Sequence, residues 1–161
     1  MYDAIHYKAN SPARVFDSTS RKTAERAALS KHTASRSIPA LMADGTVFAG
    51  ISPDTGRPMY VTPSDAPLPL TWKQAMLYAA SLDVHGHKDW RVPSRRELNQ
   101  LFRGRAAIGN FNTSESDFAG WYWSSSTYYD FNAWAQRFRD GSRNLLNAEV
   151  SARASLRCVR G

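Results

Sequence analysis

Residues 118–138 read FAGWYWSSSTYYDFNAWAQRF, and this stretch holds nine of the nineteen aromatic residues in the chain. Small polar residues fill the gaps between the rings. Large rings mixed with adaptable hydrogen-bonding residues are typical of recognition loops. Strand alternation separates rings that point inward from rings that meet a partner. The predicted inward framework consists of Trp121, Trp123, Trp134 and Phe138.

Tyr128 to Asn132 follow this framework and are predicted to form an outward-facing loop. Adjacent Tyr-Tyr-Asp-Phe cannot all face one side of a strand, so part of the run is expected to be exposed. Tyrosine and arginine are also frequent at binding hot spots. The alternative is that Tyr128, Tyr129 and Phe131 complete a second small core. The predicted ligand-binding residues are Thr127, Tyr128, Tyr129, Asp130, Phe131, Asn132, Arg137, Arg139, Ser142, Arg143, Asn144, Leu145, Leu146 and Asn147.

Two strands and two helices are predicted upstream of the aromatic segment. The strands span residues 46–51 and 59–62, joined by a turn at Ser52-Pro53-Asp54-Thr55-Gly56. Thr71 with Gln74 forms a capping box for a helix that stops by Gly86. Its predicted apolar stripe consists of Trp72, Ala75, Met76, Ala79 and Leu82.

A second capping box, Ser94 with Glu97, opens a short helix that buries Leu98, Leu101 and Phe102 and is predicted to end at Gly104. Downstream, Asp140-Gly141 is a hairpin turn signal, and residues 156–160 alternate like a strand. The order of elements predicts an α+β fold, with two helices packed on a mostly antiparallel sheet.

The chain has 161 residues and a formal charge of +7, which predicts one domain with an extension. Residues 1–40 and residues 137–161 each carry a net charge of +4. Neither end shows a Lys/Arg cluster at helical spacing or a zinc finger, so we interpret the charge as a solvated basic surface and expect no nucleic-acid partner.

Residues 1–42 are rich in Ser, Ala, Arg and Lys, and they are predicted to form a basic N-terminal arm that docks the domain of residues 43–161 into a larger assembly or a homo-oligomer. A helix at Thr23 to His32 would be marginal in isolation. The start of the chain lacks an apolar signal core, and no apolar run approaches membrane-spanning length. These features favour a virion-associated, cytoplasmic or non-classically exported protein.

Three groups of residues are candidates for catalytic or metal chemistry, but neither a cofactor nor a metal is expected. Cys158 is the single cysteine and is predicted to be a buried structural thiol. His85-Gly86-His87 lies in a turn rather than at i, i+4 on a helix, and a histidine there is expected to cap helix carbonyls. Ser124 to Ser126 lack a nucleophile elbow and are expected to pack under aromatic rings or to bond locally to backbone.

Four separated blocks carry a family resemblance. They read DWRVPSRRELNQLF, GWYWSSS, AWAQRFRDG and LRCVR, in that order between Asp89 and Arg160. Residues 43–161 thereby resemble the DUF1566 group within the C-type lectin-like (formylglycine-generating-enzyme-like) fold. Within this group the pattern is similar to the variable proteins of diversity-generating retroelements.

The resemblance implies a C-type lectin-like fold that displays mutated side chains of its C-terminal segment to a macromolecular ligand, such as a protein or cell-surface receptor. In this picture Trp134, Phe138 and Gly141 are fixed scaffold. Catalytic relatives use cysteines for oxidase chemistry, and this chain has only Cys158, so no enzymatic activity is expected. The sugar-binding E-P-N, Q-P-D and W-N-D motifs are also missing. An alternative is a phage virion structural protein, a fibre tip or decoration with the same fold.

Overall fold

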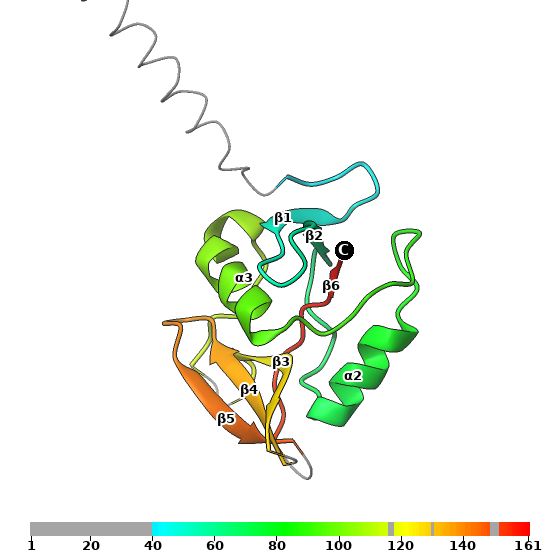
Figure 1. Ribbon diagram of the computed structural model, residues 1–161. Coiled ribbons are helices and arrows are strands. Elements are labelled where there is room, and N and C mark those ends of the chain that lie inside the picture. Colours follow the sequence, from blue (N-terminus) through cyan, green and yellow to red (C-terminus); the bar gives the residue numbers. More distant parts are fainter. Residues whose placement is uncertain (1–39, 116–117, 130, 149–151) are drawn as a thin grey trace, which may run out of the picture. The chain divides into compact units, whose positions relative to one another are not determined.

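Two small antiparallel sheets and two helices make up the part of the chain that the structure describes (Figure 1). This computed structural model describes residues 40–115, 118–129, 131–148 and 152–161. The predicted helix at residues 23–32 and nearly all of the predicted arm lie outside these ranges, as does Asp130. The elements are β1 (Val47–Ile51), β2 (Pro58–Val61), α2 (Trp72–Ser81), α3 (Arg95–Ile108), β3 (Trp121–Tyr128), β4 (Asn132–Arg137), β5 (Arg143–Asn147) and β6 (Val159–Arg160).

The strand order is β1-β2-β6 in one sheet and β3-β4-β5 in the other. All strand pairs are antiparallel. This arrangement confirms an α+β fold. The strands predicted at residues 46–51 and 59–62 match β1 and β2 to within one residue at each end. The strand predicted over residues 156–160 is shorter, because only Val159 and Arg160 pair continuously with β2.

Both predicted capping boxes are present. The Thr71 hydroxyl accepts from the Gln74 N–H while the Gln74 side chain accepts from the Thr71 N–H, and α2 begins there. Ser94 and Glu97 make the same reciprocal pair at the start of α3. Satisfying two otherwise unpaired donors at each helix start explains why these boundaries were predictable.

The predicted end of the second helix at Gly104 is wrong, because α3 continues to Ile108. Glycine inside a helix costs only about 1 kcal/mol relative to alanine. Burying Ile108 against the core offsets this cost. The helix ends instead at Gly109, which has φ +80 and donates its N–H to the Arg105 carbonyl. In α2, the predicted stripe residue Met76 is exposed, whereas Ala75 and Ala79 are buried.

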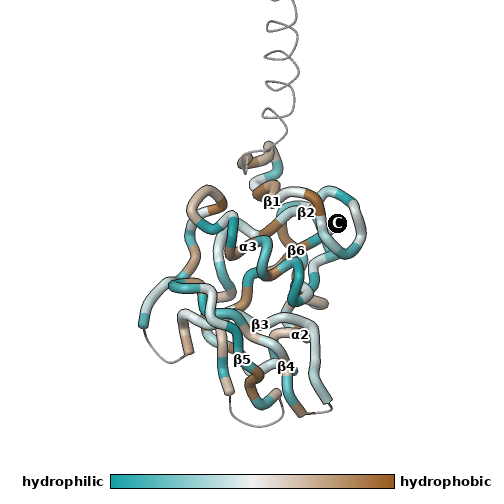
Figure 2. Tube along the Cα trace, turned by 60° about the vertical axis from the view of Figure 1, so that its left-hand side comes forward, coloured by the Kyte–Doolittle hydropathy of each residue, from teal (hydrophilic) through white to brown (hydrophobic). Residues whose placement is uncertain are grey.

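Two hydrophobic clusters fill the part of the chain that the structure describes. One packs Ala75 and Ala79 of α2 against Trp123 of β3. The other packs Leu98 and Leu101 of α3 against the first sheet and against Tyr122 of β3. The tube in Figure 2 is brown beside the β2 label, where the first sheet enters this second cluster. Strand β3 therefore has a covered side chain on both of its faces, and the two helices cover opposite sides of it.

Candidate functional site

The register of the β3-β4-β5 sheet assigns its residues to two faces. Trp123 lies opposite Ala135, and Ala135 lies opposite Asn144, so these three share the face that packs on α2. Trp134 lies opposite Leu145 on the other face, which α3 partly covers. We call these the α2 face and the α3 face. Because successive strand residues alternate between faces, this assignment determines which side chains can act together.

The predicted inward framework is confirmed in part. Trp123 and Phe138 are fully buried, and Trp121 is half-buried against the cluster that contains Trp123. Trp134 departs from the prediction. It lies on the α3 face beside the first residue of α3, and it is half-buried outside both hydrophobic clusters.

The tip of the β3–β4 hairpin exposes three large rings. Tyr128 is 48% exposed, Tyr129 76% and Phe131 53%. Tyr128 and Tyr129 contact each other edge to face, with ring centroids 4.5 Å apart. Tyr129 adopts φ +53, an uncommon conformation for a residue with a side chain. The alternative that these three rings complete a second small core is therefore wrong, and the predicted exposure of Tyr128, Tyr129 and Phe131 is confirmed. The predicted loop is shorter than expected, because Tyr128 ends β3 and Asn132, which is half-buried, begins β4.

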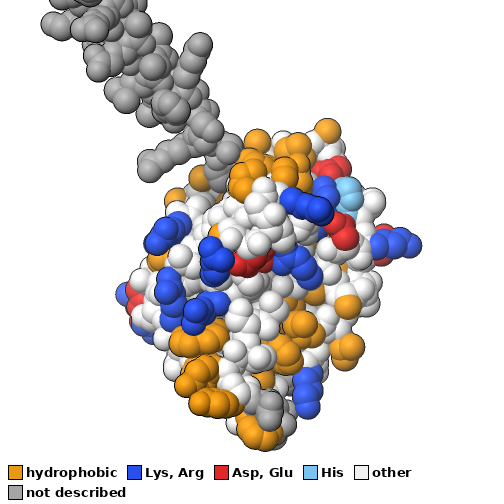
Figure 3. Space-filling view, in the orientation of Figure 1, with side chains coloured by type: hydrophobic (Ala, Val, Ile, Leu, Met, Phe, Trp, Pro, Cys, Tyr) orange, Lys and Arg blue, Asp and Glu red, His pale blue; other side chains and the backbone are white. Residues whose placement is uncertain are grey.

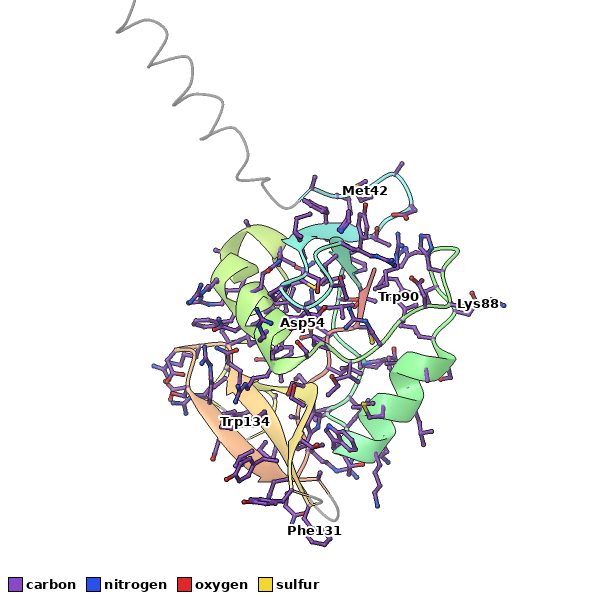
Figure 4. All side chains as sticks on the ribbon, viewed as in Figure 1. Met42, Asp54, Lys88, Trp90, Phe131 and Trp134 are labelled. Atoms are coloured by element: carbon purple, nitrogen blue, oxygen red, sulfur yellow. The ribbon has the colours of Figure 1, made fainter. Side chains whose placement is uncertain are left out.

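A groove of about 430 Å³ runs from this tip to the start of α3. In the view of Figure 4, Trp134 lies between Asp54 and Phe131. The groove is lined by Asp54, Ser94, Arg95, Arg96, Ser126, Thr127, Tyr128 and Trp134.

Polar contacts hold this groove together. The Arg95 guanidinium carbon lies 4.8 Å from the centre of the Trp134 ring, within cation–π range. The main-chain N–H of Arg95 donates to the Ser126 hydroxyl at 2.9 Å. Asp54 accepts from the Ser94 hydroxyl and lies 3.3 Å from an Arg96 nitrogen. The lining thus combines an aromatic ring with cationic, carboxylate and hydroxyl groups.

Residues 55–160 match the family model of the Lcl C-terminal domain. The chain belongs to this family. No curated protein matches the chain. The match includes both helices and the whole β3-β4-β5 sheet, and every groove residue except Asp54 falls within it.

The predicted ligand-binding residues of this Lcl C-terminal domain do not form one surface. Register places Tyr128, Asn132, Arg143, Leu145 and Asn147 on the α3 face, where the groove lies. Thr127, Asn144 and Leu146 belong to the opposite face by the same register, although Thr127 also borders the groove. Asp130 lies outside the described residues.

Arg137, Arg139 and Ser142 have structural contacts at the end of the hairpin. Arg137 donates to the Asp140 carboxylate, stacks 5.5 Å from the centre of the Trp121 ring and contacts Ser142. This hydrogen bond from Arg137 is the main reason that the pKa of Asp140 lies well below its usual range. Arg139 pairs with Glu115. The predicted Asp140-Gly141 turn is confirmed, with Gly141 at φ +83.

The His85-Gly86-His87 segment also makes structural contacts. His85 and Gly86 have positive φ in a tight turn bridged by Val84 and His87. Both histidines contact Asp44 rather than helix carbonyls, so the capping interpretation is wrong. Hydrogen bonds to Asp44, chiefly from the Thr46 N–H and then from His87, hold the pKa of this carboxyl well below its usual range. Within the described residues, no group of three potential metal ligands occurs.

Cys158 is 2% exposed, and burial raises the pKa of its thiol to about 12. This confirms the prediction of a buried structural thiol. The hydroxyls of Ser124 and Ser125 donate to the carbonyls of Trp134 and Pro93, as expected for local bonding to backbone. No helix in the described ranges is long and apolar enough to cross a membrane.

Sequence reasoning missed the contribution of α3 to the site. Arg95 and Arg96 belong to the PSRRE segment, whose pattern predicts only the start of a helix. A signal was available, since consecutive arginines at the exposed start of a helix leave their guanidiniums free to contact other elements. What the sequence did not reveal is that Trp134, thirty-nine positions after Arg95, would lie beneath one of them.

Proposed function

We propose that this Lcl C-terminal domain is a non-catalytic recognition module that displays variable C-terminal side chains on a C-type lectin-like scaffold, as retroelement-diversified proteins do. The observation that carries the proposal is the contrast along one hairpin. Trp123 and Tyr122 are fully buried, whereas Tyr128, Tyr129 and Phe131, a few residues further on, are about half exposed or more. Exposed clustered aromatics mark interaction surfaces in soluble domains.

The energetics favour replacement at the tip over replacement in the framework. Truncating a buried tryptophan such as Trp123 costs about 3–5 kcal/mol. Substitution of exposed residues away from special contacts usually changes stability by less than about 0.5 kcal/mol. The tip can therefore vary in sequence while the fold is kept. The buried Cys158 thiol, with its raised pKa, is also poorly suited to act as a nucleophile, which supports a non-catalytic role.

The test is a pair of displayed libraries of the full chain, each selected against lysozyme as the probe. The tip library randomises Tyr128, Tyr129, Phe131 and Asn132. The control library randomises four exposed residues of α2, namely Lys73, Met76, Leu77 and Ala80. We expect the tip library to stay folded and to yield lysozyme binders at a higher frequency than the control library. Equal frequencies, or loss of folded display in the tip library, would refute the proposal.

Diversification itself has a genomic test. A reverse transcriptase gene and a near-copy of the 3′ end of this gene should lie nearby, and the two copies should differ mainly at adenines. Mismatches spread evenly over all four bases would exclude diversification. The library experiment would still test the recognition role independently.

A further inference from the structure

Strand β5 lies at the edge of its sheet and, among the described strands, pairs with β4 alone. The hydrogen bonds between β4 and β5 show which main-chain groups of β5 face away from β4. Arg137 N–H donates to the Ser142 carbonyl, and Ala148 N–H donates to the Phe131 carbonyl, each at 2.8 Å. Even-numbered residues from 142 to 148 thus point their main-chain groups at β4. In an antiparallel ladder, the intervening odd-numbered residues then point theirs away from it.

Leu145 is consistent with this alternation. Its main-chain N–H donates to the side-chain oxygen of the preceding Asn144, at 2.9 Å, and not to a carbonyl of β4. An outward N–H held by a neighbouring amide side chain can exchange that partner for an incoming carbonyl. The edge of β5 therefore offers a main chain that another strand can pair with.

Helix α3 places two arginines and an asparagine over the sheet near this edge. Arg95, Asn99 and Arg103 follow each other at i, i+4 and so share one side of the helix. Asn99 lies 3.3 Å from the Gln136 side chain and 2.5 Å from the Arg143 side chain, which places this side of α3 over the α3 face of the sheet. Figure 3 shows Lys and Arg side chains gathered on the left of the molecule, above hydrophobic side chains.

Three guanidiniums of this region lack a carboxylate partner among the residues that the structure describes. They are Arg95, Arg103 and Arg143. Arg95 makes a cation–π contact with Trp134, its guanidinium carbon lying 4.8 Å from the ring centre, and such a contact leaves the positive charge of Arg95 unneutralised. The charge of the surface beside β5 therefore complements an anionic partner.

We propose that β5 accepts an extended acidic peptide as an additional strand. The inference rests on the proposed recognition function and specifies a partner for β5, which pairs with β4 beside the exposed tip. The peptide main chain pairs with the outward groups of β5 around Leu145. Alternate peptide side chains then lie on the α3 face, where acidic residues meet Arg143 and Arg95. The intervening side chains lie on the α2 face beside Leu146, where apolar residues fit.

The probe is a fluorescein-labelled peptide of about eight alternating Glu and Val residues, a typical strand length. Its binding to the full chain is measured by fluorescence polarisation. Comparison peptides alternate Lys and Val, or carry N-methyl groups at every second residue to block strand pairing. Polyphosphate serves as an anion without a peptide main chain. We expect the Glu–Val peptide to bind, and each comparison peptide to bind at least about tenfold more weakly.

Protein variants test the same contacts. Arg143→Glu should weaken the Glu–Val peptide by about tenfold or more, whereas the matched charge change Lys73→Glu on α2 should leave binding unchanged. Leu145→Pro removes the outward donor without removing a β4–β5 hydrogen bond and should also weaken binding, whereas Leu145→Val should not. Thermal unfolding of each variant verifies the fold.

The proposal is overturned if the Glu–Val peptide fails to bind, if N-methylation has no effect, or if polyphosphate displaces the peptide from an equally tight site. If the peptide fails but the tip library still yields lysozyme binders, the recognition function stands and only the acidic-peptide inference is lost. If the peptide binds while the tip library yields none, the displayed-surface proposal is the one that fails.

Discussion

Removing Asp65 should destabilise the domain strongly, because it leaves a cation buried without its counter-ion. The Arg157 side chain is 0% exposed, and its Nε lies 2.7 Å from Asp65 Oδ1. The second Asp65 oxygen accepts from the Tyr122 hydroxyl. The other guanidinium nitrogens donate to the carbonyls of Thr62, Gly109 and Asn110. In Asp65→Ala, the charge of Arg157 would face only neutral groups, namely these carbonyls and the Phe111 ring, whose centre lies 4.1 Å from the guanidinium carbon.

The magnitude follows from this burial. Breaking a buried ion pair by removing one partner costs about 3–5 kcal/mol. Arg157 cannot reach water without disrupting the loops that supply its carbonyl partners, so the upper part of this range is expected. A loss of this size is a large fraction of the ordinary stability of a domain, about 5–15 kcal/mol. The melting temperature should fall by more than about 10 °C.

Urea unfolding monitored by tryptophan fluorescence measures the loss. The control is Asp83→Ala, because Asp83 pairs with Lys88 at an exposed site and such pairs contribute about 1 kcal/mol or less. Adding Arg157→Met to Asp65→Ala should restore part of the lost stability, since the buried charge is then gone. The reasoning is refuted if Asp65→Ala loses no more than the control, or if the double variant is less stable than the single one.

Three further outcomes follow from other contacts. Burial alone would raise the pKa of Glu97, but hydrogen bonds from Arg91, Ser52 and the Ser94 N–H lower it below its ordinary value. Its contribution to the free energy of unfolding should therefore be complete above about pH 4.3 and disappear as the pH falls through the lowered pKa, and Glu97→Gln should flatten this acid limb in urea titrations. Cys158 should react with Ellman's reagent at least about 100-fold more slowly in the folded protein than in denaturant, and equal rates would contradict its burial. Gly141→Ala should cost more than Gly56→Ala in thermal unfolding. Both residues have positive φ, but a Cβ at Gly141 would lie 2.6 Å from the Phe102 ring, whereas one at Gly56 meets nothing within 4 Å.

Features encoded within a few residues were predictable from the sequence. The two capping boxes and the Asp140-Gly141 turn depend on side chains at fixed local spacing, and the structure contains all three. The end of α3 was not predictable in this way. It depends on whether burial of Ile108 outweighs the local cost of Gly104, and this balance is set by tertiary contacts.

The candidate site also combines features that local sequence predicts with features that depend on tertiary contacts. Exposure of Tyr128, Tyr129 and Phe131 followed from alternation, a local property. The groove did not, because Arg95 and Trp134 meet only after α3 packs on the sheet. The pairing of Asp65 with Arg157 joins residues 92 positions apart, and it had no local signature either. Contacts of this length depend on the complete fold, which local pattern reasoning does not reach.

The serine run explains how a rigid framework can end within a strand that continues to the exposed tip. Between Trp123 and Thr127 the register of β3 against β4 shifts. At this irregularity Ser124 donates to the Trp134 carbonyl, and the Ser125 N–H donates to the Pro93 carbonyl. The Ser126 hydroxyl accepts from the Arg95 N–H. Each serine thus fixes the chain through backbone groups, whose positions do not depend on which side chains follow.

This anchoring supports a replaceable tip on physical grounds. A substitution at Tyr128 or Tyr129 could affect Trp123 only by moving a segment that three hydrogen bonds to other elements hold in place. Each such bond contributes about 0.5–1.5 kcal/mol, and their loss would have to precede any disturbance of the core. The polar serines between the two groups of rings therefore separate the residues that maintain the fold from those proposed to meet a partner.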